Sequence, residues 1–452
     1  MSPIMSEALT QRIKELEGEL EKLRSQLKQS SEVQEQNNDG MSCQGKKASK
    51  ERPFDFSIHP KRHVALRLAY LGWAYQGFAV QENTDNTVEA RLFEALLKTR
   101  LIQDRQSSNY HRCGRTDKGV SAFSQVITID VRSTQFCGGL GVILPENVDV
   151  STKTKSDVPE LPYVKILNRV LPQDIRILDW APVAEGFSAR FDCQSRTYRY
   201  YFPRGCLDVS VMAEAAKRYE GTHDFRNLCK MDVGNGVLQF ERTILSASVK
   251  PVKPQHGGST DQYDLYVFEV KGLAFLYHQV RCMMAVLLLI GQKLETPEII
   301  DQLMDVEKNP RKPQYSMAVD YPLVLYDCHF EGLSWKQELE EVNHVLTTLQ
   351  QHWTQSTVRA HVLHGMMSGL EAIEGSRQKN YRPLLERPCC ESLESRIDHF
   401  VKRGRLEREE GEDGGETVHR GKRSKHFHNS SSPSVASEIL SLNQNTNQNE
   451  EN

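Results

Sequence analysis

The chain lacks several features that would place it in a common class. Its ten cysteines include no C-x-x-C pair, and the adjacent Cys389 and Cys390 lie in a polar stretch. This spacing predicts neither a disulfide framework nor a zinc site, and reduced thiols fit a cytosolic or nuclear compartment. The formal net charge is only -3, from 57 Lys+Arg and 60 Asp+Glu. Any affinity for nucleic acid must therefore come from a local basic surface.

A long uninterrupted apolar run is also missing. The chain does not open with a charged and then apolar signal peptide. The most apolar stretch, residues 273–291, is interrupted by His278, Gln279 and Arg281. Its clean apolar part covers about ten residues, against the roughly twenty that a membrane-spanning helix needs. We therefore expect a soluble protein with no membrane partner and with a buried helix at this position.

Both ends of the chain differ in composition from its middle. Leucine and isoleucine alternate at steps of four and three within residues 1–27, which predicts a short coiled-coil-like helix. Residues 28–61 read as a disordered linker, and residues 374–452 as a disordered charged tail, because so polar a composition buries too little apolar surface. The basic run at residues 419–425 is a nuclear address, an RNA contact or a solvated tail, so we expect the nucleus or the cytoplasm.

The folded body is expected at residues 62–356. A strand at 63–70, a helix that begins after Thr87 and a strand at 125–131 form the opening of a split β-α-β unit. Residues 133–162 are rich in Gly, Pro, Ser, Thr and Asp, which predicts an exposed insertion.

The rest of the body continues the mixture of strands and helices. Strands are expected at residues 195–202, 242–250, 263–270 and 323–330, and helices at 163–170, 275–292, from 296 onward and at 335–353. These elements predict an α+β fold with a central, mostly antiparallel sheet flanked by helices.

One polar loop carries the candidate for chemistry. Asp117 lies between Gly114 and Gly119, with two arginines and a lysine within five positions. Cationic neighbours lower the pKa of a carboxylate, so we expect Asp117 to be ionised at neutral pH and suited to nucleophilic or base chemistry. Taken alone, such an R-x-D tripeptide more often marks a surface turn held by a salt bridge. Cys113 in the same loop is expected to be a buried structural thiol.

Four ordered blocks resemble the TruA family of tRNA pseudouridine synthases, and together they cover residues 62–330. RCGRTDKGVSA at 112–122 is similar to the family's R-T-D-x-G-V core, although Ser121 stands where many bacterial members carry His. The other blocks are GFSARFD at 186–192 with RTYRY at 196–200, AFLYHQVR at 274–281, and the opening turn with Tyr70, Gly72, Tyr75, Gly77 and Phe78. Residues 230–232 and 312–318 resemble the eukaryotic branch that modifies uridines 38 and 39 of the anticodon stem-loop.

The resemblance implies roles for individual residues. Asp117 is implied as the essential carboxylate, acting as nucleophile at the sugar C1′ or as base at C2′. Arg281 is implied to pair with Asp117 and fix its orientation, since a buried unpaired charge is costly. Tyr198 is implied to stack on a uracil that has flipped out of the helix. Three basic residues of the loop are implied as RNA contacts: Arg112, Arg115 and Lys118.

The resemblance also implies properties of the whole protein. It predicts a pseudouridine synthase fold with two ferredoxin-like halves, a homodimer, tRNA as the partner, and no cofactor or metal. Three alternatives stay open at this point. The protein could be a synthase of the same family that acts at other tRNA positions, a non-catalytic tRNA-binding chaperone, or a coiled-coil scaffold.

Overall fold

The structure is a computed structural model that describes residues 54–146, 158–253, 261–368, 380–410 and 416–420, with positions 18 and 370. The helix expected at 1–27 and most of the linker at 28–61 lie outside the described residues. Asp55–Asn452 form one compact unit, and the following concerns that unit.

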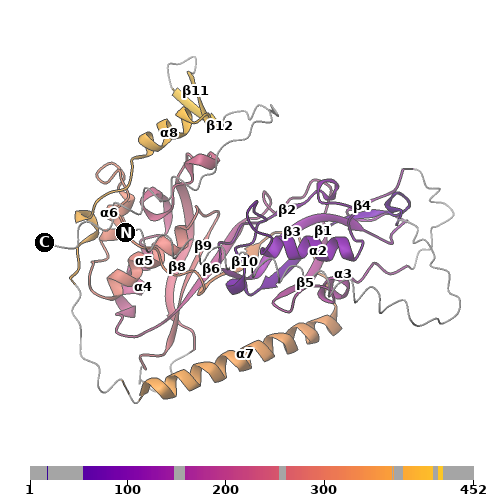
Figure 1. The fold of residues 1–452 in the computed structure, drawn as a ribbon, viewed down its shortest axis with the longest axis horizontal. Coiled ribbons are helices and arrows are strands. Elements are labelled where there is room, and N and C mark those ends of the chain that lie inside the picture. Colours follow the sequence, from indigo (N-terminus) through magenta and orange to yellow (C-terminus); the bar gives the residue numbers. More distant parts are fainter. Residues whose placement is uncertain are drawn as a thin grey trace. The chain divides into compact units, whose positions relative to one another are not determined.

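A ten-stranded sheet forms the body of the protein (Figure 1). The strand order is β4-β1-β3-β10-β6-β9-β8-β7, with β2 beside β3 and β5 beside β1. Every pair is antiparallel except β10 with β3. This architecture confirms the predicted α+β class. The strands are Lys61–Tyr70 (β1), His111–Arg112 (β2), Ser121–Arg132 (β3), Val142–Ile143 (β4), Ile175–Pro182 (β5), Ser195–Pro203 (β6), Gly221–Asp224 (β7), Glu241–Pro251 (β8), Leu265–Gly272 (β9) and Leu323–His329 (β10).

Helices cover the sheet, and one long helix runs beside it. Thr87 caps α2 as expected, because its side chain accepts a hydrogen bond from the Ala90 amide. No helix among the described residues has the length and apolar character required to cross a membrane. The helices are Val88–Lys98 (α2), Tyr163–Asn168 (α3), Val209–Lys217 (α4), Gln279–Gly291 (α5), Ile299–Met304 (α6), Leu339–Ser368 (α7) and Leu393–Lys402 (α8).

The sheet has two halves, each with its own hydrophobic core. One core lies around β1, β3, β5, α2 and α3, and the other around β6, β8, β9, α4 and α5. The halves meet where β10 lies between β3 and β6 (Figure 1). The parallel pairing of β10 with β3 spans only two residue pairs, Val324 with Ser121 and Leu325 with Ala122. The two halves are therefore joined by a short pairing, immediately after the loop that carries Asp117.

Several described elements of the body were not predicted, and one helix was predicted too short. The sequence indicated no strand at β2, β4, β5 or β7 and no helix at α4. The last helix, expected at residues 335–353, begins at Leu339 and continues to Ser368. Only Glu341 and Val345 of its 30 residues are buried, so its length is not set by packing on the core.

The prediction of a disordered tail is wrong for residues 380–410 and 416–420. They contain α8 and the hairpin of Leu406–Glu410 (β11) with Glu416–Arg420 (β12). Leu384 and Leu406 are buried in the second core, and Phe400 packs against it. A few apolar side chains are enough here because they cover an existing core. Residues 371–379, 411–415 and 421–452 lie outside the described residues, as do 147–157 of the expected insertion.

Candidate active site

The loop between β2 and β3 holds Asp117 in a fixed backbone conformation. The Phe78 amide donates to the Thr116 carbonyl at 3.1 Å, and the Gly119 amide donates to the Tyr75 carbonyl at 3.2 Å. These two bonds bracket Asp117 on both sides. The opening turn that resembled the family is therefore the support of this loop.

Two glycines of the opening turn allow this close approach. A Cβ on Gly72 would lie 1.9 Å from the Val120 carbonyl oxygen, and at that distance the two atoms would overlap. Gly77 has φ +110°, and a Cβ there would lie 3.1 Å from the Thr116 carbonyl oxygen. Larger residues at either position would push the Asp117 loop away.

Asp117 is mostly enclosed, with 21% of its side chain exposed. Burial raises its pKa to about 6, the nearby charges of Arg281 and Arg115 lower it, and Asp320 raises it. The expected net lowering of this pKa is therefore wrong, because desolvation outweighs the effect of the cationic neighbours. A carboxyl group with a pKa of about 6 is still mainly ionised at neutral pH, so Asp117 remains able to act as nucleophile or base.

His278 is the residue that faces Asp117 directly. Its Nε2 lies 3.4 Å from Asp117 Oδ2. Burial, reinforced by the charges of Arg281, Lys230 and Lys312, lowers the pKa of His278 to about 4, so the ring is neutral at physiological pH. His278 precedes α5 with φ +61°, an uncommon conformation for a non-glycine residue. The sequence placed His278 in a family block but gave it no role.

Arg281 lies three residues further along, in the first turn of α5, and only 9% of it is exposed. Its Nε donates to the Ala318 carbonyl at 2.8 Å. Among the described residues, the basic side chain in contact with the Asp117 carboxylate is the neutral His278, so the direct pairing of Arg281 with Asp117 implied by the resemblance is not formed. The guanidinium still favours the ionised Asp117 through its charge.

Tyr198 lies in the middle of β6, where the two halves of the sheet meet. Its ring makes an edge-to-face contact with Phe275, with 5.0 Å between ring centroids. Burial holds the pKa of Tyr198 well above its usual value, and the charge of Asp117 raises it further. Tyr198 is therefore a neutral phenol near the carboxylate.

The three basic residues of the loop have different surroundings. Arg115 and Lys118 are exposed and can reach a ligand. Arg112 instead pairs with Glu89 at 2.5 Å, beside Arg105. The interpretation of Arg112 as a phosphate contact is not supported, because its guanidinium compensates a carboxylate that is 1% exposed.

A basic cavity of about 470 Å³ adjoins the site through His278. None of the residues that line it is acidic. Its cationic side chains come from three separate stretches of chain: Lys230, Lys312, Arg387 and Arg396. Arg387 and Arg396 belong to the segment predicted as a disordered tail, so the sequence did not indicate that this cavity exists.

One group of described residues has the geometry of a metal site. The thiols of Cys113, Cys193 and Cys328 converge in the first core. Cys113 is 5% exposed, as expected of a buried thiol.

Comparison with known proteins gives consistent matches. The family model described as tRNA pseudouridine synthase matches residues 215–331. The chain is 53% identical to tRNA pseudouridine(38/39) synthase of Homo sapiens, over 89% of each chain. It is 44% identical to the protein of the same name from Saccharomyces cerevisiae, over 65% of this chain and 62% of that one. It is 29% identical to tRNA pseudouridine synthase A of Thermococcus onnurineus, over 68% of this chain and 99% of the relative.

Proposed function

We propose that this chain, which belongs to the family of tRNA pseudouridine synthases, isomerises uridine to pseudouridine at positions 38 and 39 of the anticodon stem-loop. The observation that carries the proposal is the Asp117 carboxylate, which its loop holds in place and which contacts His278, a residue that also lines the basic cavity. The two target positions are those in the name of the human relative.

The reaction breaks the glycosidic C–N bond, rotates the uracil and rejoins it to the sugar through C5. The base must first leave the helical stack, which costs a few kcal/mol. Attack by Asp117 at C1′ and proton abstraction by Asp117 at C2′ both require the ionised carboxylate. With a pKa of about 6, Asp117 is a stronger base than an exposed aspartate and is still mainly ionised at pH 7.

The neighbours of Asp117 divide the remaining tasks. Tyr198 presents a neutral aromatic ring on which the detached uracil can stack. Arg281 favours the charged form of Asp117 without occupying the carboxylate oxygens. Apart from the 3.4 Å contact of Oδ2 with His278, those oxygens are therefore available to the substrate.

The basic cavity and the exposed Arg115 and Lys118 supply the surface on which we place the RNA backbone. Lys230 lines the cavity, is exposed, and lies 5.6 Å from the centre of the Tyr277 ring. For Lys230→Ala we expect weaker tRNA binding and a salt dependence reduced by about one phosphate contact. Unchanged binding across a salt titration would remove this cavity from the RNA path.

The decisive experiment is a pseudouridine assay on an anticodon stem-loop transcript. Wild type should form product at U38 and U39, and transcripts with cytidine at one position should lose product there only. Asp117→Ala should lose at least about 1,000-fold in rate, whereas Asp104→Ala, in a surface turn, should not. Equal product from wild type and Asp117→Ala would sink the catalytic assignment. No product from either, with tight tRNA binding, would favour the chaperone.

We further propose that the protein is a homodimer, and α7 is the surface that supports this. Its apolar residues recur at alternating steps of three and four along one face, and they are exposed by 37–77%. They are Leu339, Val342, Leu346, Leu349 and Trp353. This is the seam pattern of a two-helix coiled coil, and a helix of 30 residues is about 45 Å long.

Light scattering tests the dimer directly. Wild type should have twice the mass of one chain, and the double variant Leu346→Glu with Trp353→Glu should be monomeric. Gln351→Glu lies on the other face of α7 and should leave the dimer intact. A monomeric wild type at micromolar concentration would overturn the proposal.

A further inference from the structure

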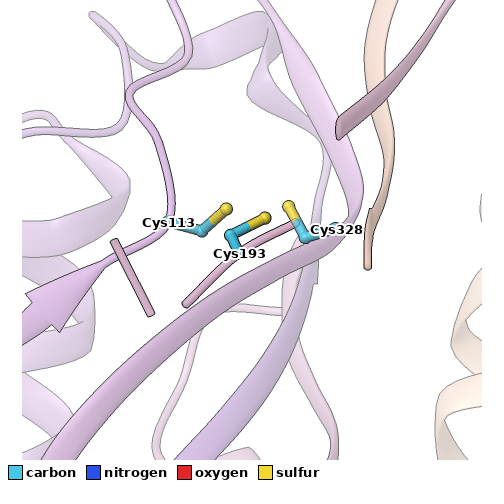
Figure 2. A group of neighbouring side chains, drawn as sticks. All are labelled: Cys113, Cys193 and Cys328. Atoms are coloured by element: carbon cyan, nitrogen blue, oxygen red, sulfur yellow. The ribbon is translucent and has the colours of Figure 1, made fainter. Parts of the chain in front are cut away.

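Three cysteines that are far apart in the sequence meet beside the active site. Cys113 follows β2 and lies four residues before Asp117, Cys193 precedes β6, and Cys328 is in β10. Their sulfur atoms all lie within 4.8 Å of one another. Figure 2 shows the three sulfur atoms side by side, each from a different segment of the chain. The three residues are 5%, 8% and 5% exposed, so water has little access.

A guanidinium adjoins the three thiols. Arg196 donates to the Cys113 carbonyl at 3.1 Å and to the Cys193 carbonyl at 3.4 Å. No ion pair among the described residues gives Arg196 a carboxylate partner. Burial lowers the pKa of Arg196, but the negative charge available on the three sulfurs raises it overall. The Arg196 guanidinium can therefore compensate negative charge on the thiolates.

The positions of the three thiols suit a single small cation. Their sulfur atoms converge from three separate segments of the chain, and no two of them are more than 4.8 Å apart. This arrangement is a ready ligand set for a cation that prefers sulfur.

We propose that Cys113, Cys193 and Cys328 bind a single thiophilic d10 metal ion, Zn²⁺ or Cu⁺, through three thiolates. Metal–sulfur bonds of about 2.3 Å in a trigonal arrangement place the sulfurs about 4.0 Å apart. That spacing lies within the observed limit of 4.8 Å, so shifts of less than 1 Å suffice. The site does not depend on the proposed function.

Binding of the metal ion by the three thiolates involves no change in oxidation state. Three metal–sulfur bonds form, and each sulfur that carries a proton releases it to solvent. Zn²⁺ with three thiolates has a net charge of -1, which Arg196 neutralises, whereas Cu⁺ more readily accepts three-coordination. A disulfide fits less well, because it joins two sulfurs at about 2.05 Å and leaves the third unused.

The ion would fasten the catalytic loop to the junction of the two halves. Cys113 is fixed to β3 by its amide, which donates to the Val126 carbonyl at 2.9 Å. A bond through the metal to Cys328 would add a link from this loop to β10. Metal loading is therefore expected to raise the unfolding temperature of the whole chain.

The test uses the full-length protein, reduced and freed of metal, with Zn²⁺ and Cu⁺ added in separate anaerobic titrations. We expect one equivalent bound per chain by elemental analysis and, with Co²⁺ as a probe, a thiolate-to-metal absorption band. Cys193→Ala and Cys328→Ala should each weaken binding at least 10- to 100-fold. Cys229→Ala, which removes a thiol buried in the other core, should bind as wild type does. The titration that saturates identifies the ion.

Two results would overturn the proposal. One is a folded wild type that takes up neither ion and gains no thermal stability from either. The other is equal uptake by wild type and by the double variant Cys193→Ala with Cys328→Ala. Wild-type uptake and its thermal shift keep the test valid even if a variant fails to fold. Spontaneous loss of two mass units per chain without metal uptake would indicate a redox pair instead.

Discussion

Two carboxylates close in sequence, Glu89 and Asp117, have opposite surroundings. Glu89 in α2 is 1% exposed, yet it receives four hydrogen bonds, from the Val80 amide, Arg105, Tyr110 and Arg112. Burial alone would raise its pKa, but these donors lower it overall. Asp117 is less buried but faces a neutral histidine, and its pKa rises to about 6.

The difference separates a structural carboxylate from a reactive one. The carboxylate oxygens of Glu89 already accept four hydrogen bonds from its neighbours, so they are not available to a substrate. Asp117 is held by the backbone of its loop, while its oxygens are only weakly engaged. Carboxylates with raised pKa values in a basic cleft are the candidates for chemistry. The number of cationic residues near a carboxylate in the sequence does not by itself distinguish the structural Glu89 from the reactive Asp117.

The largest loss of stability is expected when Glu89, whose charge two arginines compensate, is replaced by a neutral residue. Glu89→Gln leaves Arg105 and Arg112 without their shared partner, and because these side chains are 40% and 29% exposed the cost in the free energy of unfolding should be near the lower end for a buried pair, about 3 kcal/mol. Urea denaturation measures it. Glu94→Gln, which breaks the exposed pair with Arg91 in the same helix, should cost less than about 0.5 kcal/mol. Similar losses from both variants would show that the Glu89 network is not what stabilises this half.

A smaller effect of opposite sign is expected at Asp117. Its folded-state pKa of about 6 exceeds the ordinary value of 3.8, so the wild type loses stability as pH rises from about 4 through 6. Asp117→Asn avoids this loss and should be more stable by about 2 kcal/mol at pH 7.5, while being inactive. The gain should disappear toward pH 4. Thermal unfolding across this pH range measures it, and a less stable variant at pH 7.5 would mean that Asp117 is paired.

Sequence reasoning predicted the fold better than the electrostatics of the site. Helical periodicity and the Thr87 cap were enough to predict α2, and runs of apolar residues were enough for β1 and α5, which are buried on nearly all sides. The raised pKa of Asp117 could not be predicted, because it depends on desolvation by segments remote in the sequence. The meeting of Cys113, Cys193 and Cys328 is equally a product of topology. The contribution of Arg387 to the cavity was missed because a polar segment can be ordered by a core that belongs to other elements.

The smallest effect is expected at His278, and it shows whether a neutral neighbour tunes Asp117. Facing a carboxylate, the neutral ring can only donate its N–H, and at 3.4 Å the bond is weak. His278→Asn tolerates the left-handed backbone but is too short to reach, so Asp117 should lose a few tenths of a kcal/mol of stabilisation of its charged form.

The acid limb of the kcat/KM profile, near pH 6 in the wild type, should then move upward by a few tenths of a pH unit. Tyr277→Phe keeps the aromatic contact with His278, at 3.7 Å between ring centroids, and should leave the limb in place. A lower kcat with an unmoved limb would show that His278 does not act through the pKa of Asp117, and that its weak contact is not what distinguishes this carboxylate from Glu89.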